Sequence, residues 1–342
     1  MTVAVLGPGG VGGLVAGVLH RDGVAVEVIA QESTANLIAE RGLSVRSEMF
    51  GEFLARVPAR ARLTAQDKAA AQDAAGDESR VTARDNEAPD IEGRDNDVDV
   101  LVVAPKAAGL RDALERIEVA PRLVLPLLNG LDHIAVLRER FAPETVLAGT
   151  IRVESYRPEP GVIVHGSPFV LIDMATRYDS ALEPMQALGR VLEHAGIPVR
   201  VTLPVSAASE AQVMWSKLAR LCALACTTSA YDLPLGEIRS TPELRADLIG
   251  AIEEACAVGQ AEGAADVDPQ VAIAELELAH PTLRSSMQRD IAAGRPPELD
   301  AIPGAVLRAG ARHGIACPTI ARLVGLIAAR AGVSVPVVSA SG

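Results

Sequence analysis

Aromatic side chains are scarce in this sequence, and positive charge is not in excess. Phe, Tyr and Trp make up 2% of the 342 residues, and the formal net charge is -12. A nucleic-acid-binding protein needs a basic surface for the phosphates and, for single strands, rings on which bases stack. The composition therefore argues against nucleic acid as a partner.

Long hydrophobic runs are also missing. The apolar stretch Val3–Leu6 is far too short for the hydrophobic region of a signal peptide, and no basic segment precedes it. Nowhere do about eighteen apolar residues follow one another, which is the length that a membrane span needs. We expect a cytoplasmic protein with no membrane partner.

Cysteine is rare, with only Cys222, Cys226, Cys256 and Cys317 present. Cys222 and Cys226 have the i, i+4 spacing of a helical metal pair, but no His or further Cys stands close to them in sequence. We interpret them as small buried residues of a reduced protein rather than as a metal site.

The chain has ample material for two packed cores. Hydrophobic residues make up 49% of a chain that is too long for one ordinary core. We place a dinucleotide-binding domain at residues 1–200 and a helical domain for substrate binding and dimerisation at residues 201–335.

Short apolar runs alternate with helical spacing through the first domain. Strands are predicted at Val3–Leu6, Val24–Ile29, Leu43–Val45, Val98–Val103, Leu123–Leu127 and Val146–Gly149. Helices are predicted at Val11–His20, Asn36–Glu40, Leu110–Ile117 and Ile134–Arg140. This alternation indicates an α/β fold, a Rossmann-type doubly wound parallel sheet. Two β-type runs flank the turn Pro158–Gly161, and from Ser206 onward the spacing is helical, which predicts an all-helical C-terminal domain.

The segment Ala65–Asp97 differs in composition from its surroundings. It is rich in Ala, it contains ten acidic and four basic residues, and it has almost no apolar side chains that could be buried. We expect a solvated, disordered and dispensable insertion in the first domain, with an acidic partner-binding arm as the alternative.

The first predicted strand ends in a glycine-rich turn. Gly7-Pro8-Gly9-Gly10-Val11-Gly12 fits G-x-G-x-x-G, follows a strand and opens a helix. Gly7 allows the tight turn, Gly9 lets the backbone approach a pyrophosphate, and Gly12 permits close packing of helix on strand. Gly10 and Val11 begin the helix, whose free N–H groups attract phosphate. This context predicts a dinucleotide site.

The end of the second strand commonly distinguishes NAD from NADP. An acidic residue there accepts hydrogen bonds from the ribose of NAD, whereas an Arg pairs with the extra phosphate of NADP. Here Gln31 is neither, and the following Glu32 is either a ribose ligand or a solvated loop residue. This position leaves the choice of cofactor open.

Three later points place polar groups in apolar surroundings. Lys106 ends one buried strand, and Asn129-Gly130 ends the next, at the sheet edge where such folds bind ligands. Lys217 lies in the otherwise apolar helix Met214–Ala219. A lysine there is either a helix-edge residue with its charge in water or, if desolvated, a proton donor near neutral pH.

Together with Ser285–Ile291 and Glu298–Asp300, these motifs resemble the ketopantoate reductase (2-dehydropantoate 2-reductase) family along almost the whole chain. The resemblance implies a Rossmann domain and a helical domain with substrate bound between them. It also implies reduction of 2-dehydropantoate to pantoate, a step of pantothenate biosynthesis.

Carried over by position, the resemblance assigns a role to each site residue. Lys217 is the general acid that protonates the carbonyl oxygen, and Glu298 is the carboxylate that orients the substrate. Ser286 binds the substrate carboxylate, Asn129 lies near the nicotinamide and the reacting oxygen, and Lys106 lies near the adenosine phosphate.

Three positions depart from the family pattern. Leu221 and Leu283 stand where side-chain amides are common, and Gln31 replaces the Arg of NADP-dependent members. Without these amides the site offers fewer polar partners to a hydroxylated substrate, so the identity of the 2-oxo acid stays open.

We therefore predict a nicotinamide-dependent reductase of a small 2-oxo acid, forming a homodimer and using NADP, with NAD as the alternative. Another hydroxy-acid or imine oxidoreductase on the same frame is the second hypothesis. A non-catalytic NAD(P)-binding sensor is the third, against which Lys217, Ser286 and Glu298 speak because a sensor needs none of them.

Overall fold

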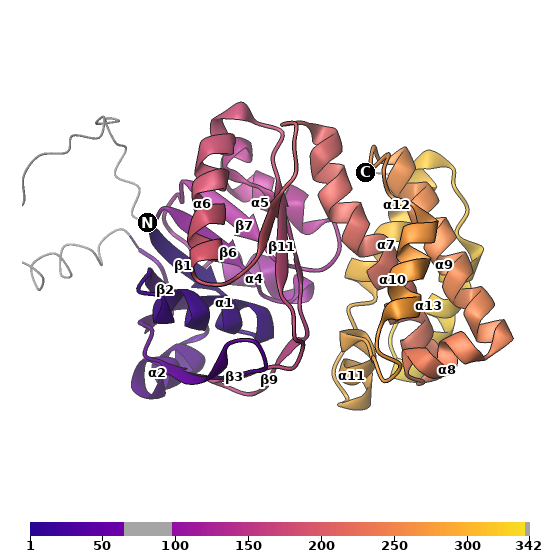
Figure 1. The fold of residues 1–342 in the computed structure, drawn as a ribbon, viewed down its shortest axis with the longest axis horizontal. Helices are drawn as coiled ribbons and strands as arrows, with labels where there is room; N and C mark the ends of the chain where they lie inside the picture. The colour runs from indigo at the N-terminus through magenta and orange to yellow at the C-terminus, as the bar shows by residue number, and fades with distance from the viewer. Residues whose placement is uncertain (65–97, 339–342) are drawn as a thin grey trace, which may run out of the picture.

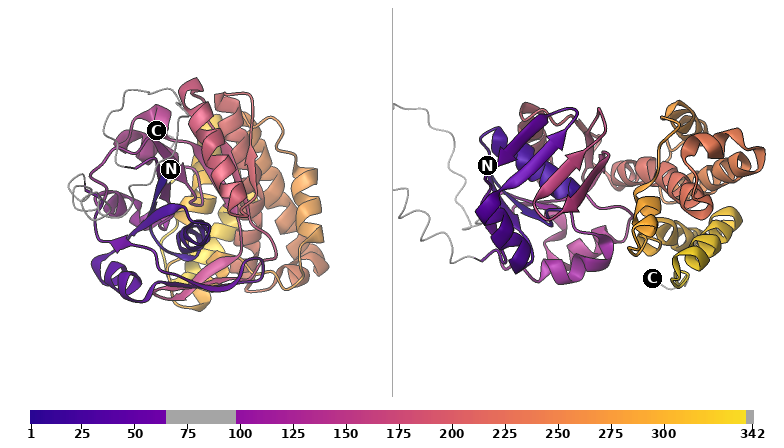
Figure 2. Two further views of the ribbon diagram at one scale, coloured as in Figure 1. Left: turned by 60° about the vertical axis from the view of Figure 1, so that its left-hand side comes forward. Right: turned by 90° about the horizontal axis from the view of Figure 1, so that it is seen from below.

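The computed structural model describes residues 1–64 and 98–338. An α/β lobe, here called the sheet lobe, extends to Val201, and a helical lobe begins at Ala207. The long helix α7 (Ala207–Tyr231) lies where the two lobes meet (Figures 1 and 2). The predicted insertion Ala65–Asp97 lies outside the described residues.

A five-stranded parallel sheet forms the centre of the sheet lobe, in the order β5-β2-β1-β6-β7. Its strands are β1 (Thr2–Leu6), β2 (Ala25–Ile29), β5 (Ala59–Arg60), β6 (Val100–Val103) and β7 (Leu123–Pro126). The helices that connect or follow them are α1 (Gly10–Arg21), α2 (Glu32–Arg41), α4 (Leu110–Leu114) and α5 (His133–Arg140). The alternation of apolar runs and helical spacing thus predicted the parallel sheet and its strands β1, β2, β6 and β7 correctly. The strands predicted at Leu43–Val45 and Val146–Gly149 belong to other sheets, and β5 was not predicted.

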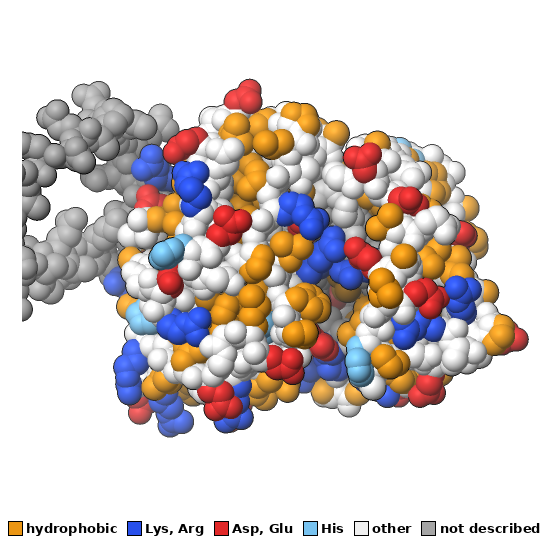
Figure 3. All heavy atoms as spheres, in the orientation of Figure 1, with side chains coloured by type: hydrophobic (Ala, Val, Ile, Leu, Met, Phe, Trp, Pro, Cys, Tyr) orange, Lys and Arg blue, Asp and Glu red, His pale blue; other side chains and the backbone are white. Residues whose placement is uncertain are grey.

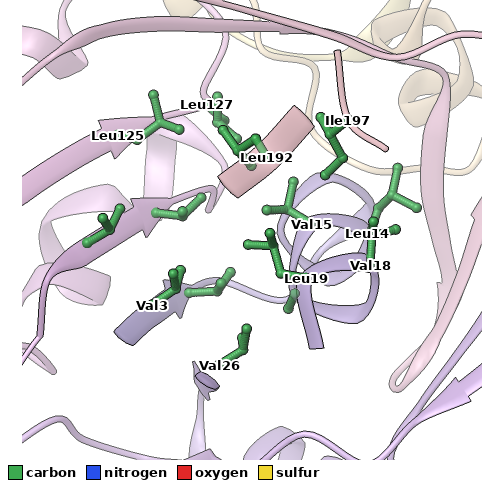
Figure 4. Packing of buried hydrophobic residues seen from close by; sticks show 14 of the residues in the cluster. Val3, Leu14, Val15, Val18, Leu19, Val26, Leu125, Leu127, Leu192 and Ile197 are labelled. Carbon is green, nitrogen blue, oxygen red and sulfur yellow. The ribbon is translucent and has the colours of Figure 1, made fainter. Parts of the chain in front are cut away.

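The core of this lobe is built from aliphatic side chains, as the scarcity of aromatics requires. In α1, Leu14, Val15, Val18 and Leu19 are buried, and they lie beside residues of the sheet (Figure 4). Helix α6 (Leu182–His194), which the sequence analysis did not predict, contributes residues to the same cluster. Helix-on-sheet packing of this kind fixes the carboxyl edge of the sheet.

Two smaller sheets complete the sheet lobe. One has the order β4-β3-β10-β9, formed by β3 (Leu43–Ser47), β4 (Gly51–Ala55), β9 (Ser155–Glu159) and β10 (Val162–His165). The other has the order β12-β11-β8, formed by β8 (Ala148–Arg152), β11 (Leu171–Ala175) and β12 (Val199–Val201). The two β-type runs predicted around the turn Pro158–Gly161 are confirmed as β9 and β10, which pair antiparallel, although β9 continues to Glu159.

Among the strands whose bounds differ from the prediction, one concerns the site. The strand predicted at Val146–Gly149 is β8, which extends to Arg152, because Thr150 and Ile151 pair with Asp173 and Ile172 of β11. A parallel bridge between Val124 and Val146 leads the chain alongside β7 just before β8 begins. The carboxyl end of β8 therefore lies near that of β7.

The C-terminal part is all-helical, as predicted. After α7 come α8 (Leu235–Ser240), α9 (Pro242–Ala261), α10 (Pro269–Leu278), α11 (Ser286–Ala292), the π-helical turn η4 (Asp300–Gly304), α12 (Ala305–His313) and α13 (Pro318–Ala331). All four cysteines are buried here and form no disulfide, in agreement with their interpretation as small core residues. No helix in the described ranges is long and apolar enough to cross a membrane.

Candidate active site

The polar groups of the site converge from both lobes. From the sheet lobe, Lys106 follows β6, Asn129 follows β7, and Arg152 ends β8. From the helical lobe, Lys217 projects from α7, and Glu298 lies two residues before η4. Since parallel strands end at a common edge, the sheet presents its polar residues together where the helical lobe meets it.

A chain of hydrogen bonds joins the two lobes through Asn129. The Nζ of Lys217 donates to Oδ1 of Asn129 over 2.9 Å, and Nδ2 of Asn129 donates to Oε2 of Glu298 over 3.0 Å. All three side chains are half-buried. The lysine donates to the amide oxygen and the carboxylate accepts from the amide nitrogen, so the orientation of the Asn129 amide is fixed.

The turn that carries Asn129 requires glycine at the next position. Gly130 has φ +87°, and a Cβ there would overlap the carbonyl oxygen of Ala301 in η4. The loop after β7 therefore packs closely against the helical lobe, and this close approach holds Asn129 beside Lys217.

Lys217 is poised to exchange a proton near neutral pH. Burial lowers its pKa from 10.5 to about 8; the charges of Arg220 and Arg152 act in the same direction, whereas Glu298 and Asp173 raise it. A lysine with this pKa is largely protonated at pH 7 and still a usable acid.

His133, the first residue of α5, is a buried neighbour that the sequence analysis did not identify. It is 4% exposed, and neither ring nitrogen has a hydrogen-bond partner. Burial, assisted by the charge of Lys217, lowers the pKa of His133 to about 3, so the imidazole is neutral. The signal in the sequence that could have identified His133 was its position four residues after Asn129.

The glycine-rich turn lies at the amino end of α1, as predicted. Gly7 has φ +88°, and a Cβ on Gly12 would overlap the Gly7 carbonyl oxygen. A Cβ on Gly9 would meet nothing within 4 Å, and no side chain caps the first turn of α1. The N–H groups of Gly10 and Val11 at that turn are thus left for an external acceptor.

Two residues expected near the cofactor lie in different settings. Gln31 is exposed and forms the N-terminal boundary of α2. Lys106 pairs across the lobes with Asp290 of α11, with Nζ 2.7 Å from Oδ2, and Arg295 binds the other oxygen of the same carboxylate at 2.8 Å. Lys106 therefore already has an anionic partner, a pairing that sequence spacing could not indicate.

Ser286 and its neighbour Ser285 have distinct environments. Ser285 is buried, caps α11 by accepting from the N–H of Gln288, and accepts a hydrogen bond from Thr228 over 2.8 Å. Ser286 is the first residue of α11, and its side chain is exposed. The side chain that caps α11 is therefore that of Ser285, not that of Ser286.

Two arginines near Lys217 were missed by the sequence analysis. Arg152 ends β8, and Arg220 follows Lys217 by three positions on α7. Figure 3 shows basic side chains gathered between the lobes on the face drawn, with acidic ones beside them. Placing the end of β8 correctly would have identified Arg152, because it follows the same strand-end rule as Lys106 and Asn129.

Within the described part of the chain, no three His, Cys, Asp or Glu side chains gather as metal ligands would. Cys222 and Cys226 lie with their sulfur atoms 4.0 Å apart inside the helical core.

Known families and proteins match this chain over nearly its full length. The family model described as "Ketopantoate reductase PanE/ApbA" matches residues 3–172, and its C-terminal counterpart matches residues 211–331. A 2-dehydropantoate 2-reductase of Halobacterium salinarum is 30% identical over 334 residues, covering 96% of this chain and 98% of the relative. The uncharacterized oxidoreductase YkpB of Bacillus subtilis is 27% identical over 94% of this chain and 95% of its own length.

Solved structures share the two-lobed fold. A ketopantoate reductase from Ralstonia eutropha has a TM-score of 0.74 at 25% identity and covers 97% of this chain and 99% of its own. A D-mandelate dehydrogenase, solved with NADH and anilino(oxo)acetate, has a TM-score of 0.78 at 21% identity with the same coverage. At such low identity the second likeness concerns the fold alone.

Proposed function

This chain belongs to the ketopantoate reductase family and is an oxidoreductase of that family, and from this membership we propose that it reduces a small 2-oxo acid to a 2-hydroxy acid with a nicotinamide cofactor. The observation that supports the proposal most strongly is the hydrogen-bonded chain from Lys217 through Asn129 to Glu298. A protein that only binds a dinucleotide has no need of a desolvated lysine held in this way.

In the proposed reaction Lys217 is the general acid. The carbonyl oxygen of a ketone gains negative charge as its carbon is reduced, and the Nζ of Lys217 protonates that oxygen. Until it is neutralised, the ammonium charge also stabilises the developing oxyanion. Asn129 holds Nζ through its Oδ1, and Glu298 holds Asn129 and favours the charged form of the lysine. Substrate contacts of Ser286, Asn129 and Glu298 stay predictions.

The turn Gly7–Gly12 fits a dinucleotide. The open side of Gly9 and the uncapped first turn of α1 allow a pyrophosphate to approach the backbone N–H groups of Gly10 and Val11. When bound, the reduced nicotinamide supplies the hydride. Asn129, at the neighbouring strand end, is the residue that we expect beside the nicotinamide.

We propose NADPH as the preferred cofactor, by a modest margin. The charge of Lys106 favours a phosphate, but Lys106 is shared with Asp290, and Gln31 offers no charge. One exposed charge pair contributes about 1 kcal/mol, so the discrimination is expected to be nearer tenfold than thousandfold. The D-mandelate dehydrogenase of similar fold was solved with NADH, so both cofactors belong in the test.

The test follows nicotinamide absorbance with the purified full chain, each cofactor, and a panel of 2-oxo acids and cyclic imines. The expected result is oxidation of the cofactor by at least one 2-oxo acid. Turnover of imines alone would favour the second hypothesis, and cofactor binding without any turnover would favour a sensor. The homodimer, the cytoplasmic location and the domain boundaries at residues 200 and 201 stay predictions.

A further inference from the structure

The two arginines beside Lys217 are held loosely by their carboxylate partners. The Nε of Arg152 lies 3.6 Å from Oδ2 of Asp173, too far for a hydrogen bond, and has no other hydrogen-bond partner. Its Nη1 reaches Oε1 of Glu275 only at 3.4 Å, and the Nε of Arg220 lies 3.3 Å from the second oxygen of Glu275. A guanidinium forms short paired bonds with a well-placed carboxylate, so the forks of Arg152 and Arg220 are incompletely used.

Positive charge is concentrated at this point of the lobe junction. Lys217, Arg152 and Arg220 influence one another: burial lowers the pKa of Arg220, and the charge of Arg152 lowers it further, while Glu275 and Asp173 raise it. The side chain of Arg152 is only 17% exposed, so water screens these charges weakly. Another anion would relieve the repulsion among the three cations.

Both arginines lie close enough to Lys217 for their charges to lower its pKa. Arg152 is the last residue of β8, whose carboxyl end lies near that of β7, the strand that Asn129 follows. Arg220 follows Lys217 by three positions on α7 and thus shares its helix face. In a 2-oxo acid the carboxylate is bonded directly to the carbonyl carbon, so the groups that bind this carboxylate must lie near Lys217.

Two further residues of the helical side are apolar. Leu221 follows Lys217 by one helical turn, and Leu283 lies just before α11, which packs against α7. Both leucines are partly buried against the helical core. Neither can donate or accept a side-chain hydrogen bond to a substrate hydroxyl.

We propose that Arg152 and Arg220 receive the substrate carboxylate, and that Leu221 and Leu283 select a 2-oxo acid with an apolar side chain. This inference rests on the proposed function and adds to it the group that recognises the acid and the class of side chain that is accepted. If the arginines do not bind substrate, their ion pairs with Asp173 and Glu275 serve only as a structural brace between β8, β11, α7 and α10.

The first test compares a 2-oxo acid with its uncharged ester in Arg152→Gln, Arg220→Gln and the control Arg200→Gln. Arg200 pairs with the same Asp173 as Arg152 but is 61% exposed and does not influence Lys217. We expect the KM for the acid to rise roughly 10- to 100-fold in both site variants, with a smaller change in kcat. The KM for the ester is expected to stay within about threefold, and Arg200→Gln to resemble the wild type.

Folding is checked by thermal unfolding, because Arg152→Gln leaves the buried Asp173 with one partner fewer. If that variant does not fold, Arg220→Gln decides the matter, since its partner Glu275 is partly solvated. Equal rises in KM for acid and ester would identify a brace and overturn the carboxylate site. An unchanged KM for the acid would overturn it as well.

The second test uses 3,3-dimethyl-2-oxobutanoate and its 4-hydroxy derivative, which differ by one hydroxyl group. We expect kcat/KM to favour the apolar compound by roughly 10- to 100-fold, the limit for an apolar pocket. Leu221→Asn is expected to reduce this ratio about tenfold, whereas Leu224→Asn, one turn further along α7, leaves it unchanged. A preference of the wild type for the hydroxylated acid would overturn the apolar selection.

Failure of the inference is distinguishable from failure of the proposed function. An enzyme that reduces 2-oxo acids but shows none of these variant effects overturns the inference alone. A wild-type protein that oxidises no cofactor with any 2-oxo acid overturns both.

Discussion

Replacement of Lys217 by alanine tests whether this side chain acts as the catalytic acid or only contributes to stability. The change removes the Nζ atom that donates to Asn129 over 2.9 Å. The folded state lowers the pKa of Lys217 to about 8, so its charged form opposes folding below that pH. This opposition disappears as the pH rises from about 8 to the ordinary value of 10.5. At pH 7 we therefore expect Lys217→Ala to unfold at the wild-type temperature or slightly above it.

The expected effect on turnover is much larger. General acid catalysis contributes about 10²- to 10⁴-fold, which corresponds to roughly 3 to 5 kcal/mol of the activation barrier. We expect kcat for 2-oxo acid reduction to fall by that factor in Lys217→Ala. The dissociation constant of the cofactor, measured by fluorescence titration, should stay unchanged because the glycine turn at Gly7–Gly12 lies on the other lobe.

The pH dependence distinguishes an acid from a mere positive charge. Reduction needs protonated Lys217, so the wild-type rate is expected to be level below pH 8 and to fall about tenfold per pH unit above it. Lys217→Arg keeps the charge, but a guanidinium stays protonated throughout this range. That variant should be slow and show no decline near pH 8.

The result that would refute this reasoning is a folded Lys217→Ala enzyme with wild-type turnover on the substrate that the panel identifies. A matched control is Ser216→Ala, which alters the adjacent position of α7 and the hydrogen bond from Gln212 to Ser216 without touching Asn129. Equal losses in both variants would indicate a general disturbance of α7.

Three smaller changes test other parts of the structure. Gln31→Arg should raise the preference for NADPH, measured by titration, from roughly tenfold to a hundredfold, and tighter binding of NADH would contradict the assignment. Gly130→Ala should lower the free energy of unfolding by about 2 kcal/mol or more, because the residue has φ +87° and the new Cβ would overlap a backbone carbonyl oxygen. The control Gly109→Ala, whose Cβ would meet open space, should leave the free energy of unfolding unchanged. His133→Leu removes two buried ring nitrogens that lack partners and should not lower the free energy of unfolding in chemical denaturation. By contrast, His165→Leu breaks the hydrogen bonds of that ring with two serine hydroxyls and a backbone carbonyl, and should lower the free energy of unfolding by about 2 kcal/mol. A comparable loss in both histidine variants would show that the first imidazole is bonded.

The parallel sheet and its ligand edge were predictable because they depend on local patterns. An apolar run followed by glycines or a lone polar residue marks the end of a buried strand, and this rule identified Gly7, Lys106 and Asn129. Lys217 was identified by its contrast with an apolar helix. The whole sequence contains only three lysines, and two of them lie at this site.

The pairings between these residues were not predictable from spacing. Asn129 and Glu298 are 169 positions apart, and Lys106 and Asp290 are 184 positions apart. Such contacts depend on how the helical lobe docks, which no local pattern encodes. Arg152 was missed for a different reason, because β8 continues through pairing with β11 beyond the apolar run that marked it.

The acidity of Lys217 is set jointly by the two lobes. The charge of Arg152, from the sheet lobe, lowers the pKa of Lys217, and the charge of Glu298, from the helical lobe, raises it. Asn129 forms a hydrogen bond with both Lys217 and Glu298. A displacement of one lobe would therefore change the proton affinity of the lysine as well as its reach. The ion pair of Arg289 with Glu154, 2.8 Å long, is one of the contacts that keep the lobes in this relation. Substitutions at the junction between the lobes are thus expected to change kcat by shifting the pKa of Lys217, even where the substituted residue contacts neither substrate nor cofactor. The pH above which the rate of reduction falls therefore depends on how the two lobes are docked.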